Sequence, residues 1–245
     1  MTKPRDIVFE ELDYQQTELG ELILRRRSVL QMPGTVVHEV KLDGSFLMSS
    51  LVNASEVALA ELGLSELGNG PLEVVVGGLG LGYTAKAALD HAGVESLIVI
   101  EFLQPVISWH ERGLVPLGET LQQDPRCRLV HDDFFVRALD GTGGFDPDDR
   151  ERRFDAILLD IDHTPTSLLH ERHRRCYSAK GLARLASHLK PGGAFALWSS
   201  EAPEALFLDE MSKVFCDVVG HRVEFENPLL NMQDVNAVYV GRVQE

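Results

Sequence analysis

The stretch LEVVVGGLGLG, residues 72–82, decides the fold of this chain. Its first half is an apolar run of strand length, and its second half is rich in glycine and leads into a helical pattern from Tyr83. Glycine lets the backbone adopt positive φ and lets a ligand approach the main chain, while the following helix offers free N–H groups. An ordinary tight strand-to-helix connection is the alternative, so context must decide. We expect the glycines of this turn to bind a nucleotide cofactor: Gly77, Gly78, Gly80 and Gly82.

The second part of this context is an acid at the end of the next strand. The run SLIVIE, residues 96–101, ends on Glu101, about 20 residues beyond the glycines. A carboxylate at that position accepts hydrogen bonds from both hydroxyls of a ribose. Because the turn and the acid are linked by their spacing, together they predict that a nucleoside lies between the turn and Glu101.

A third polar position follows the strand after that. The segment HDDF, residues 131–134, offers two carboxylates, and one of them accepts a hydrogen bond from an adenine amino group in this interpretation. We choose Asp132 for this contact, with Asp133 beside it and Phe134 flanking the ring. The alternative is that these acids cap the helix of residues 134–139 or lie in solvent.

Apolar runs alternate with helical stretches from residue 72 onward, which indicates a parallel sheet covered on both faces. We therefore predict an α/β fold, Rossmann-like, with a mostly parallel seven-stranded sheet flanked by helices. The expected strands are residues 72–76, 96–101, 128–131, 155–160, 194–198, 218–225 and 236–243. The expected helices are residues 83–92, 105–112, 179–189 and 203–215.

The N-terminal part of the chain has a different pattern. Short alternating runs at residues 21–24, 35–42 and 45–48 predict a small β-hairpin element within residues 1–52. A nucleotide-binding transferase domain then occupies residues 53–245, beginning with a helix. Residues 140–153, rich in Gly, Asp and Arg, are expected to form a surface loop.

Charge and cysteine content limit the function classes. The 245 residues carry a formal net charge of −15 at pH 7, which disfavours nucleic acid and anionic membranes as partners. An amine substrate suits this charge, although acidity for solubility alone is as consistent with it. The 3 cysteines have no CxxC spacing, and the N-terminus lacks an apolar signal segment. We expect a cytoplasmic protein without disulfides or a bound metal.

A nicotinamide-dependent dehydrogenase is a competing interpretation. Residues 80–85, GLGYTA, fit the GxGxxA form of a dinucleotide fingerprint. A dinucleotide also requires a second nucleotide-binding half, and no such features follow downstream. The chain is short for a separate substrate domain as well, so the mononucleotide interpretation is preferred.

Five segments in order, VVVGGLGLG, LIVIE, HDDFF, FDAILLDID and LKPGG, resemble the motif series of class I S-adenosylmethionine-dependent methyltransferases. The resemblance is closer to the spermidine synthase-like (polyamine aminopropyltransferase-like) branch. It covers roughly residues 72–200, and the β-rich segment before it is similar to that branch's N-terminal domain. It implies S-adenosylmethionine, or its decarboxylated form, as cofactor, and an N-terminal element of that kind implies a homodimer.

The chain departs from aminopropyltransferases at two motifs. In that branch the glycine loop reads GGGDGG, whereas Gly80 replaces the loop aspartate here and removes a contact to the cofactor's amino end. A DSSDP-like segment follows the fourth strand in the branch, but this chain reads DIDHTP over residues 160–165, which places His163 at the position of the second acid and displaces Asp162 by one residue.

Asp160 is the best catalytic candidate, because the carboxyl end of a central strand adjoins the crevice where open α/β sheets bind ligands. It would act as a general base or hold the acceptor near the sulfonium. His163 is a second candidate base, because histidine side chains in general titrate near neutral pH, and Asp162 would orient it. The alternative is that Asp160 and Asp162 only cap a turn before Pro165.

The sequence thus predicts an S-adenosylmethionine-dependent transferase, and methyl transfer to a small-molecule acceptor, such as an amine, is placed first. Methyl transfer is placed first because the chain lacks acids of the two motifs near the amino-acid end of the cofactor. Their loss weakens discrimination against the carboxylate of S-adenosylmethionine. The alternatives are aminopropyl transfer from decarboxylated S-adenosylmethionine to a polyamine, and a catalytically inactive cofactor-binding module.

Overall fold

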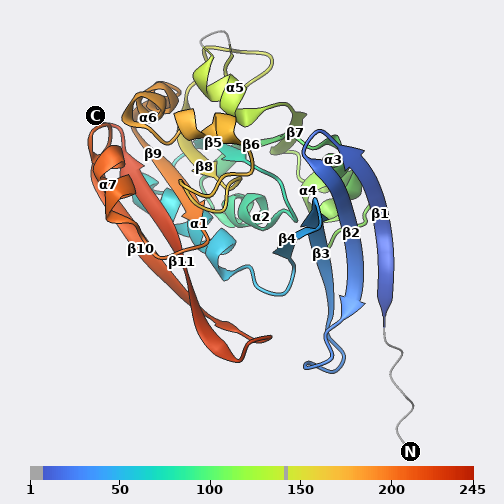
Figure 1. Cartoon of the computed structure of the whole chain (residues 1–245). Helices are drawn as coiled ribbons and strands as arrows, with labels where there is room; N and C mark the ends of the chain where they lie inside the picture. The colour runs from blue at the N-terminus through green and yellow to red at the C-terminus, as the bar shows by residue number, and fades with distance from the viewer. Residues whose placement is uncertain (1–7, 141–142) are drawn as a thin grey trace, which may run out of the picture.

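The structure, a computed structural model, describes residues 8–140 and 143–245. Within these residues the strands form two sheets, and helices cover the larger one (Figure 1). The helices are α1 (Ala54–Leu64), α2 (Tyr83–Asp90), α3 (Gln104–Glu111), α4 (Gly118–Gln123), α5 (Phe134–Leu139), α6 (Ala179–Ala186) and α7 (Ala205–Ser212), with the 3-10 helices η1 (Ser65–Leu67) and η2 (Glu171–Arg175). None of the helices described is long and apolar enough to cross a membrane.

The N-terminal sheet is an antiparallel meander in the order β1-β2-β3-β4. Its strands are β1 (Phe9–Thr17), β2 (Gly20–Ser28), β3 (Val36–Leu42) and β4 (Ser45–Ser49). It is larger than the expected hairpin because β1 adds an edge strand. That strand is mostly exposed and polar, so it lacks the apolar alternation that reveals a half-buried strand. β2 and β3 bury Leu22, Leu24 and Val40 against the rest of the molecule.

The larger sheet has the strand order β10-β11-β9-β8-β5-β6-β7. Its strands are β5 (Leu72–Gly77), β6 (Val94–Glu101), β7 (Cys127–His131), β8 (Phe154–Leu159), β9 (Leu189–Ser199), β10 (Cys216–Asn227) and β11 (Met232–Arg242). The five strands from β7 to β9 are parallel, whereas β10 and β11 form an antiparallel hairpin at one edge. The mostly parallel sheet that the sequence predicts is therefore confirmed.

The strand order reverses between β5 and β8, because the chain runs from β5 to β6 and β7 and then returns to the other side of β5. Ligands of open α/β sheets bind at such a switch point, outside the carboxyl ends of the strands. The two strands are in register up to Gly77 and Leu159, and the amide of Asp160 donates to the Gly77 carbonyl at 2.8 Å. The glycine turn and Asp160 therefore follow β5 and β8 at the same level of the sheet.

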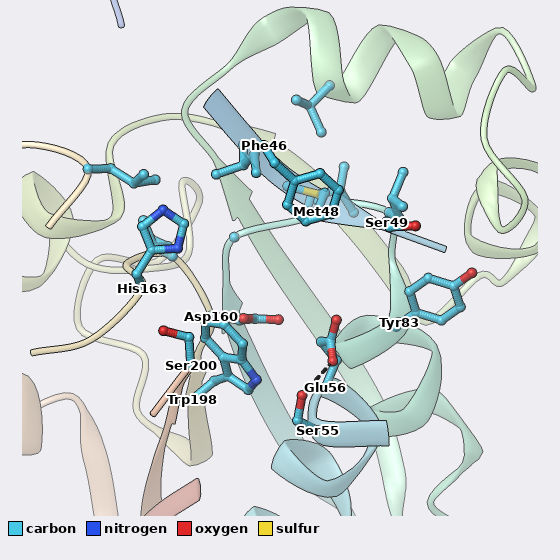
Figure 2. A pocket seen from close by; sticks show the side chains of 18 of the residues that line it. Phe46, Met48, Ser49, Ser55, Glu56, Tyr83, Asp160, His163, Trp198 and Ser200 are labelled. Carbon is cyan, nitrogen blue, oxygen red and sulfur yellow. Dashed lines mark hydrogen bonds between the residues drawn. The ribbon is translucent and has the colours of Figure 1, made fainter. Parts of the chain in front are cut away.

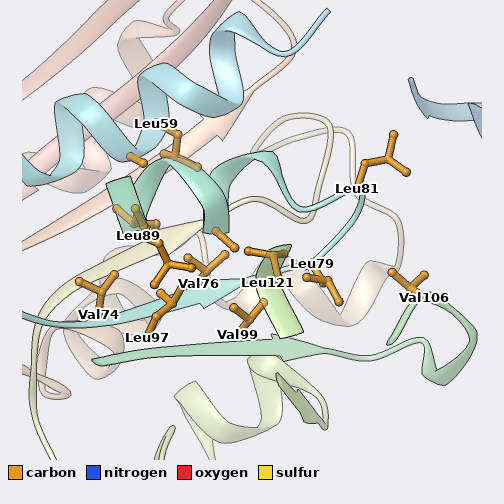
Figure 3. Packing of buried hydrophobic residues seen from close by; sticks show 14 of the residues in the cluster. Leu59, Val74, Val76, Leu79, Leu81, Leu89, Leu97, Val99, Val106 and Leu121 are labelled. Atoms are coloured by element: carbon orange, nitrogen blue, oxygen red, sulfur yellow. The ribbon is translucent and has the colours of Figure 1, made fainter. Parts of the chain in front are cut away.

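Apolar side chains pack on both faces of the sheet. On one face Leu59 of α1 and Leu89 of α2 lie over Val74, Val76 and Leu97 of the strands (Figure 3). On the other face a second cluster joins α5, α6 and α7 to the sheet. Because the central strands are buried from both sides, only their carboxyl ends remain available to a ligand.

The segment expected as a surface loop is packed where it is described. Phe145 is fully buried and stacks on Phe134 at 5.0 Å between ring centroids, and Asp146 is buried in an ion pair with Arg152 at 2.6 Å. Residues 141–142 of the expected loop lie outside the described residues. Phe145 lies among polar residues in the sequence, so the pattern did not predict that its side chain is buried.

Candidate functional site

The glycine turn after β5 has the backbone conformation that favours glycine. Gly78, Gly80 and Gly82 have φ of +93°, +50° and +93°, respectively. A Cβ on Gly78 would lie 2.1 Å from the carbonyl oxygen of Asp160, closer than real Cβ atoms come. Gly77 has a different role, because a Cβ there would lie 2.7 Å from the ring of Phe134 and the residue does not line the cavity beside it. Gly77 therefore allows packing behind the turn.

A cavity of about 640 Å³ lies in front of this turn. The glycine turn and the ends of β6 and β8 form its inner wall, while β4 and the turn between β10 and β11 line its outer part. Figure 2 shows Glu56, Asp160, His163 and Trp198 around it. Residues from both ends of the chain thus meet at the switch point of the sheet.

Glu101 lies at the cavity wall and binds the glycine turn. Its carboxylate accepts the backbone N–H groups of Leu79 at 2.9 Å and Leu103 at 2.7 Å, one on each oxygen. Burial raises the pKa of this carboxyl, and the backbone amides act in the opposite direction. The backbone amides of Gly80 and Phe102 also act on this carboxylate. Glu101 therefore fixes the turn, and it also lines the cavity.

The two acids after β7 have separate roles. Asp132 is paired with Arg137 at 2.7 Å and does not line the cavity. Asp133 lines it, caps α5 through the amide of Phe135 at 2.9 Å, and pairs with Arg172 at 3.0 Å. The choice of Asp132 for a cofactor contact therefore does not agree with this arrangement, and Asp133 is the better candidate. Two adjacent acids after a strand point in different directions, and the sequence does not tell which one faces a ligand.

Asp160 meets a second carboxylate that we did not expect, Glu56 of α1. The hydroxyl of Thr84 donates to Asp160 at 2.7 Å, and the hydroxyl of Ser55 donates to Glu56 at 2.8 Å. Burial, together with the negative charge of Glu56, raises the pKa of Asp160 from 3.8 to about 7, against the opposing effect of the Thr84 bond. Burial also raises the pKa of Glu56.

No cation neutralises this acid pair within the described lining of the cavity. Arg172 is the one lysine or arginine among those lining residues, and it is held by Asp133. The guanidinium also lies over the ring of Phe102, at 5.0 Å from its centroid. A ligand that carries a positive charge would therefore be the natural partner of Glu56 and Asp160.

Asp162 faces away from the cavity, which corrects its assignment as a catalytic residue. Its side chain is 1% exposed and accepts hydrogen bonds from Nδ1 of His173 at 2.9 Å and from the Tyr177 hydroxyl at 2.7 Å. His163 does line the cavity, and its backbone carbonyl accepts from the amide of Ser200 at 2.7 Å. The expected pair of Asp162 with His163 is thus wrong, because the acid binds a different histidine.

One acid of the site, Glu56, escaped the sequence analysis. Glu56 looks like an ordinary acid in the first turn of a helix, a position that the helix dipole favours. The sequence offers two roles for Trp198 at the end of the fifth parallel strand, core packing first and the border of a substrate pocket second. In the structure Trp198 lines the cavity, and its buried indole N–H has no hydrogen-bond partner within the described residues. Glu56 belongs to no motif, so only the packing of α1 beside the switch point reveals it.

Comparisons with known proteins agree with this architecture. No protein-family model matches the chain. A polyamine aminopropyltransferase of Pyrobaculum islandicum is 24% identical over 160 residues, which are 65% of this chain and 50% of that protein. Polyamine aminopropyltransferase 2 of Pseudomonas aeruginosa is 25% identical over 162 residues, 62% of this chain and 42% of that protein. The chain spans about half the length of these curated relatives.

Two solved structures cover nearly the whole chain. A spermidine synthase in complex with the transition state analogue AdoDATO has a TM-score of 0.70 at 19% identity, covering 95% of this chain and 73% of that one. The spermidine synthase from Thermotoga maritima has a TM-score of 0.69 at 18% identity, with 95% and 72% covered. The chain has the spermidine synthase fold, and its resemblance to the spermidine synthase-like branch is confirmed.

Proposed function

We propose that this chain transfers an aminopropyl group from decarboxylated S-adenosylmethionine to an amine. The observation that carries the proposal is the acid pair of Glu56 and Asp160 in a cavity whose single arginine is already paired with Asp133. The curated relatives are named for aminopropyl transfer, which supports this alternative over methyl transfer, the activity that the sequence analysis placed first.

The nucleoside would bind at the glycine turn. Backbone groups of Gly78 and Gly80 would lie along it, Glu101 would accept the ribose hydroxyls, and Asp133 would lie near the base. In this arrangement the ribose hydroxyls share the Glu101 carboxylate with the backbone amides of Leu79 and Leu103.

The acid pair favours the decarboxylated donor for an electrostatic reason. S-adenosylmethionine carries a carboxylate at its amino-acid end, which Glu56 and Asp160 would repel with no cation beside them to compensate. The decarboxylated donor has no carboxylate, so the negative charge of the two acids does not oppose its binding. The aspartate missing at Gly80 led us to expect weak selection against the carboxylate, but Glu56 places an acid in the same cavity from α1.

The chemistry requires an uncharged amine as the nucleophile. Asp160, with a pKa of about 7, is suited to take a proton from the acceptor's ammonium group near neutral pH. The amine nitrogen then attacks the propyl carbon next to sulfur, an N–C bond forms, and the C–S bond breaks with its electron pair going to sulfur. The products are methylthioadenosine and an aminopropylated amine, and His163 is a second group in the cavity that would accept the proton.

The test is release of methylthioadenosine by the purified chain with the decarboxylated donor and a panel of amines, followed by chromatography. We expect release that depends on an amine and falls at least about 100-fold in Asp160→Asn. Parallel reactions contain S-adenosylmethionine itself. Formation of S-adenosylhomocysteine without methylthioadenosine would establish methyl transfer instead, and tight donor binding without turnover would indicate an inactive module.

A further inference from the structure

The outer part of the cavity has a different chemistry from the acid pair. Two segments far apart in the sequence line it: β4 with the residues after it, and the turn between β10 and β11 (Figure 1). The side chains that they contribute are mostly apolar, including Phe46, Met48, Leu51, Val52, Leu229 and Leu230. An acceptor held at the acid pair would therefore have an apolar wall within the same cavity.

Large apolar side chains of this wall remain in contact with water. Phe46 is 56% exposed and Leu230 is 65% exposed, although both line the cavity. Apolar groups that gather at the mouth of a cavity typically mark a ligand-binding surface, because a ligand that covers them removes apolar area from water. The wall thus favours an acceptor that carries an apolar group.

The carboxylates of the outer part offer little to a second positive charge. Glu39 is 3% exposed and is held by Arg25 at 2.7 Å and by Arg27 at 2.6 Å, so its charge is already neutralised. Asp234 is the other acid there, and one of its oxygens accepts the backbone N–H of Val235 at 2.9 Å. A linear diamine would have to place its far ammonium group along a wall with this single acid.

We propose that the acceptor is an amine with one ammonium group and an apolar tail, rather than a linear diamine. The amine lies at Glu56 and Asp160, and the tail lies along Phe46 and Leu230. The indole of Trp198, which lines the cavity near Asp160 in Figure 2, offers its ring face to the ammonium group. This inference rests on the proposed aminopropyl transfer.

The experiment compares amines that differ by one terminal amino group: hexylamine with 1,6-diaminohexane, and octylamine with 1,8-diaminooctane. Release of methylthioadenosine gives kcat/KM, and calorimetry in the presence of methylthioadenosine gives affinity. We expect each monoamine to exceed its matched diamine at least about tenfold, and kcat/KM to rise about fourfold per methylene from butylamine to hexylamine.

Variants locate the effect in the cavity. Leu230→Ser should lower kcat/KM for hexylamine about tenfold and leave the affinity for methylthioadenosine unchanged. The matched control is Leu206→Ser on α7, because Leu206 is 79% exposed and lies outside the cavity lining. Asp234→Asn should lower kcat/KM for 1,6-diaminohexane more than for hexylamine, because only the diamine has a second ammonium group that could pair with this acid.

Two results would overturn the inference: diamines that match or exceed the monoamines, or an Asp234→Asn variant that loses turnover of the preferred amine. If no amine releases methylthioadenosine, the aminopropyl transfer itself fails. Calorimetry then still decides the acceptor site, since tighter hexylamine binding supports an apolar amine, whereas equal, weaker or absent binding contradicts it.

Discussion

Oδ1 of Asp162 lies 2.9 Å from Nδ1 of His173, and both side chains are buried. The hydroxyl of Tyr177 completes the arrangement by donating to the other carboxylate oxygen at 2.7 Å. Only two positions earlier in the chain, Asp160 lines the cavity, and no lysine or arginine among the described residues pairs with it. Two acids of one short motif therefore differ in role, one structural and one available for chemistry.

Replacement of these two acids should separate the roles. Asp162→Asn should lower the free energy of unfolding by about 2–3 kcal/mol, because a buried, charge-assisted acceptor for His173 and Tyr177 is weakened. Asp160→Asn should instead leave a folded protein whose transfer activity is lost. Urea unfolding and methylthioadenosine release, measured on both variants, check this. Equal stability losses in the two variants would contradict the assignment.

Asp160 also predicts how stability depends on pH. Its folded-state pKa is raised, so its contribution to stability is present below about pH 3.8 and is lost as the pH rises through about 7. The wild-type free energy of unfolding should therefore fall across this range relative to that of Asp160→Asn, in which the titrating group is absent. Urea titrations at several pH values measure the difference. Parallel curves for the two proteins would argue against a desolvated Asp160.

The activity should depend on pH in the opposite sense. Asp160 must be ionised to accept a proton, so kcat/KM should rise as the pH increases through about 7. Glu56→Gln removes the negative charge that helps to raise the pKa of Asp160, so the rise should move to lower pH. Glu61→Gln is the matched control, because Glu61 is an exposed acid on the same helix. If the pH profile of kcat/KM were unshifted in Glu56→Gln, the charge of Glu56 would not affect the pKa of Asp160.

Glu101→Gln tests the ribose contact. The amide keeps an oxygen acceptor for one backbone N–H of the turn but loses the charge that strengthens bonds to the hydroxyls. We expect at least about tenfold weaker binding of methylthioadenosine by calorimetry, which corresponds to about 1.4 kcal/mol. Glu95→Gln serves as control, since Glu95 is an exposed acid on the same strand. If both variants bound the nucleoside like the wild type, the proposed position of the ribose would be rejected.

Two glycines of the turn should differ in their tolerance of alanine. Both have positive φ, which costs an alanine about 1–2 kcal/mol. At Gly80 the new Cβ would meet the flexible Met48 side chain at 3.0 Å, whereas at Gly78 it would meet the rigid Asp160 carbonyl at 2.1 Å. Gly78→Ala should therefore lower the Tm clearly more than Gly80→Ala in calorimetric scans, and the reverse order would show that the turn rearranges.

Much of the site depends on local pattern and could be predicted. The glycines had to follow a buried strand, Glu101 had to end the next one, and Asp160 had to end a third, because parallel strands bring their carboxyl ends to one edge. These features have short sequence spacings or fixed places on strands. Glu56 has neither, and the adjacent acids Asp132 and Asp133 have identical chemistry, so no pattern separates them.

The sequence by itself determined the parallel sheet, the glycine turn and the acids at the strand ends, since apolar periodicity and backbone freedom are local properties. Only the tertiary structure decided which acids meet. Packing of α1 beside α2 brings Glu56 into the cavity with Asp160. The turn that leads into η2 places His173 within hydrogen-bond distance of Asp162. The physical reason is that desolvation and charge coupling depend on distances between residues far apart in the chain, which local patterns do not encode.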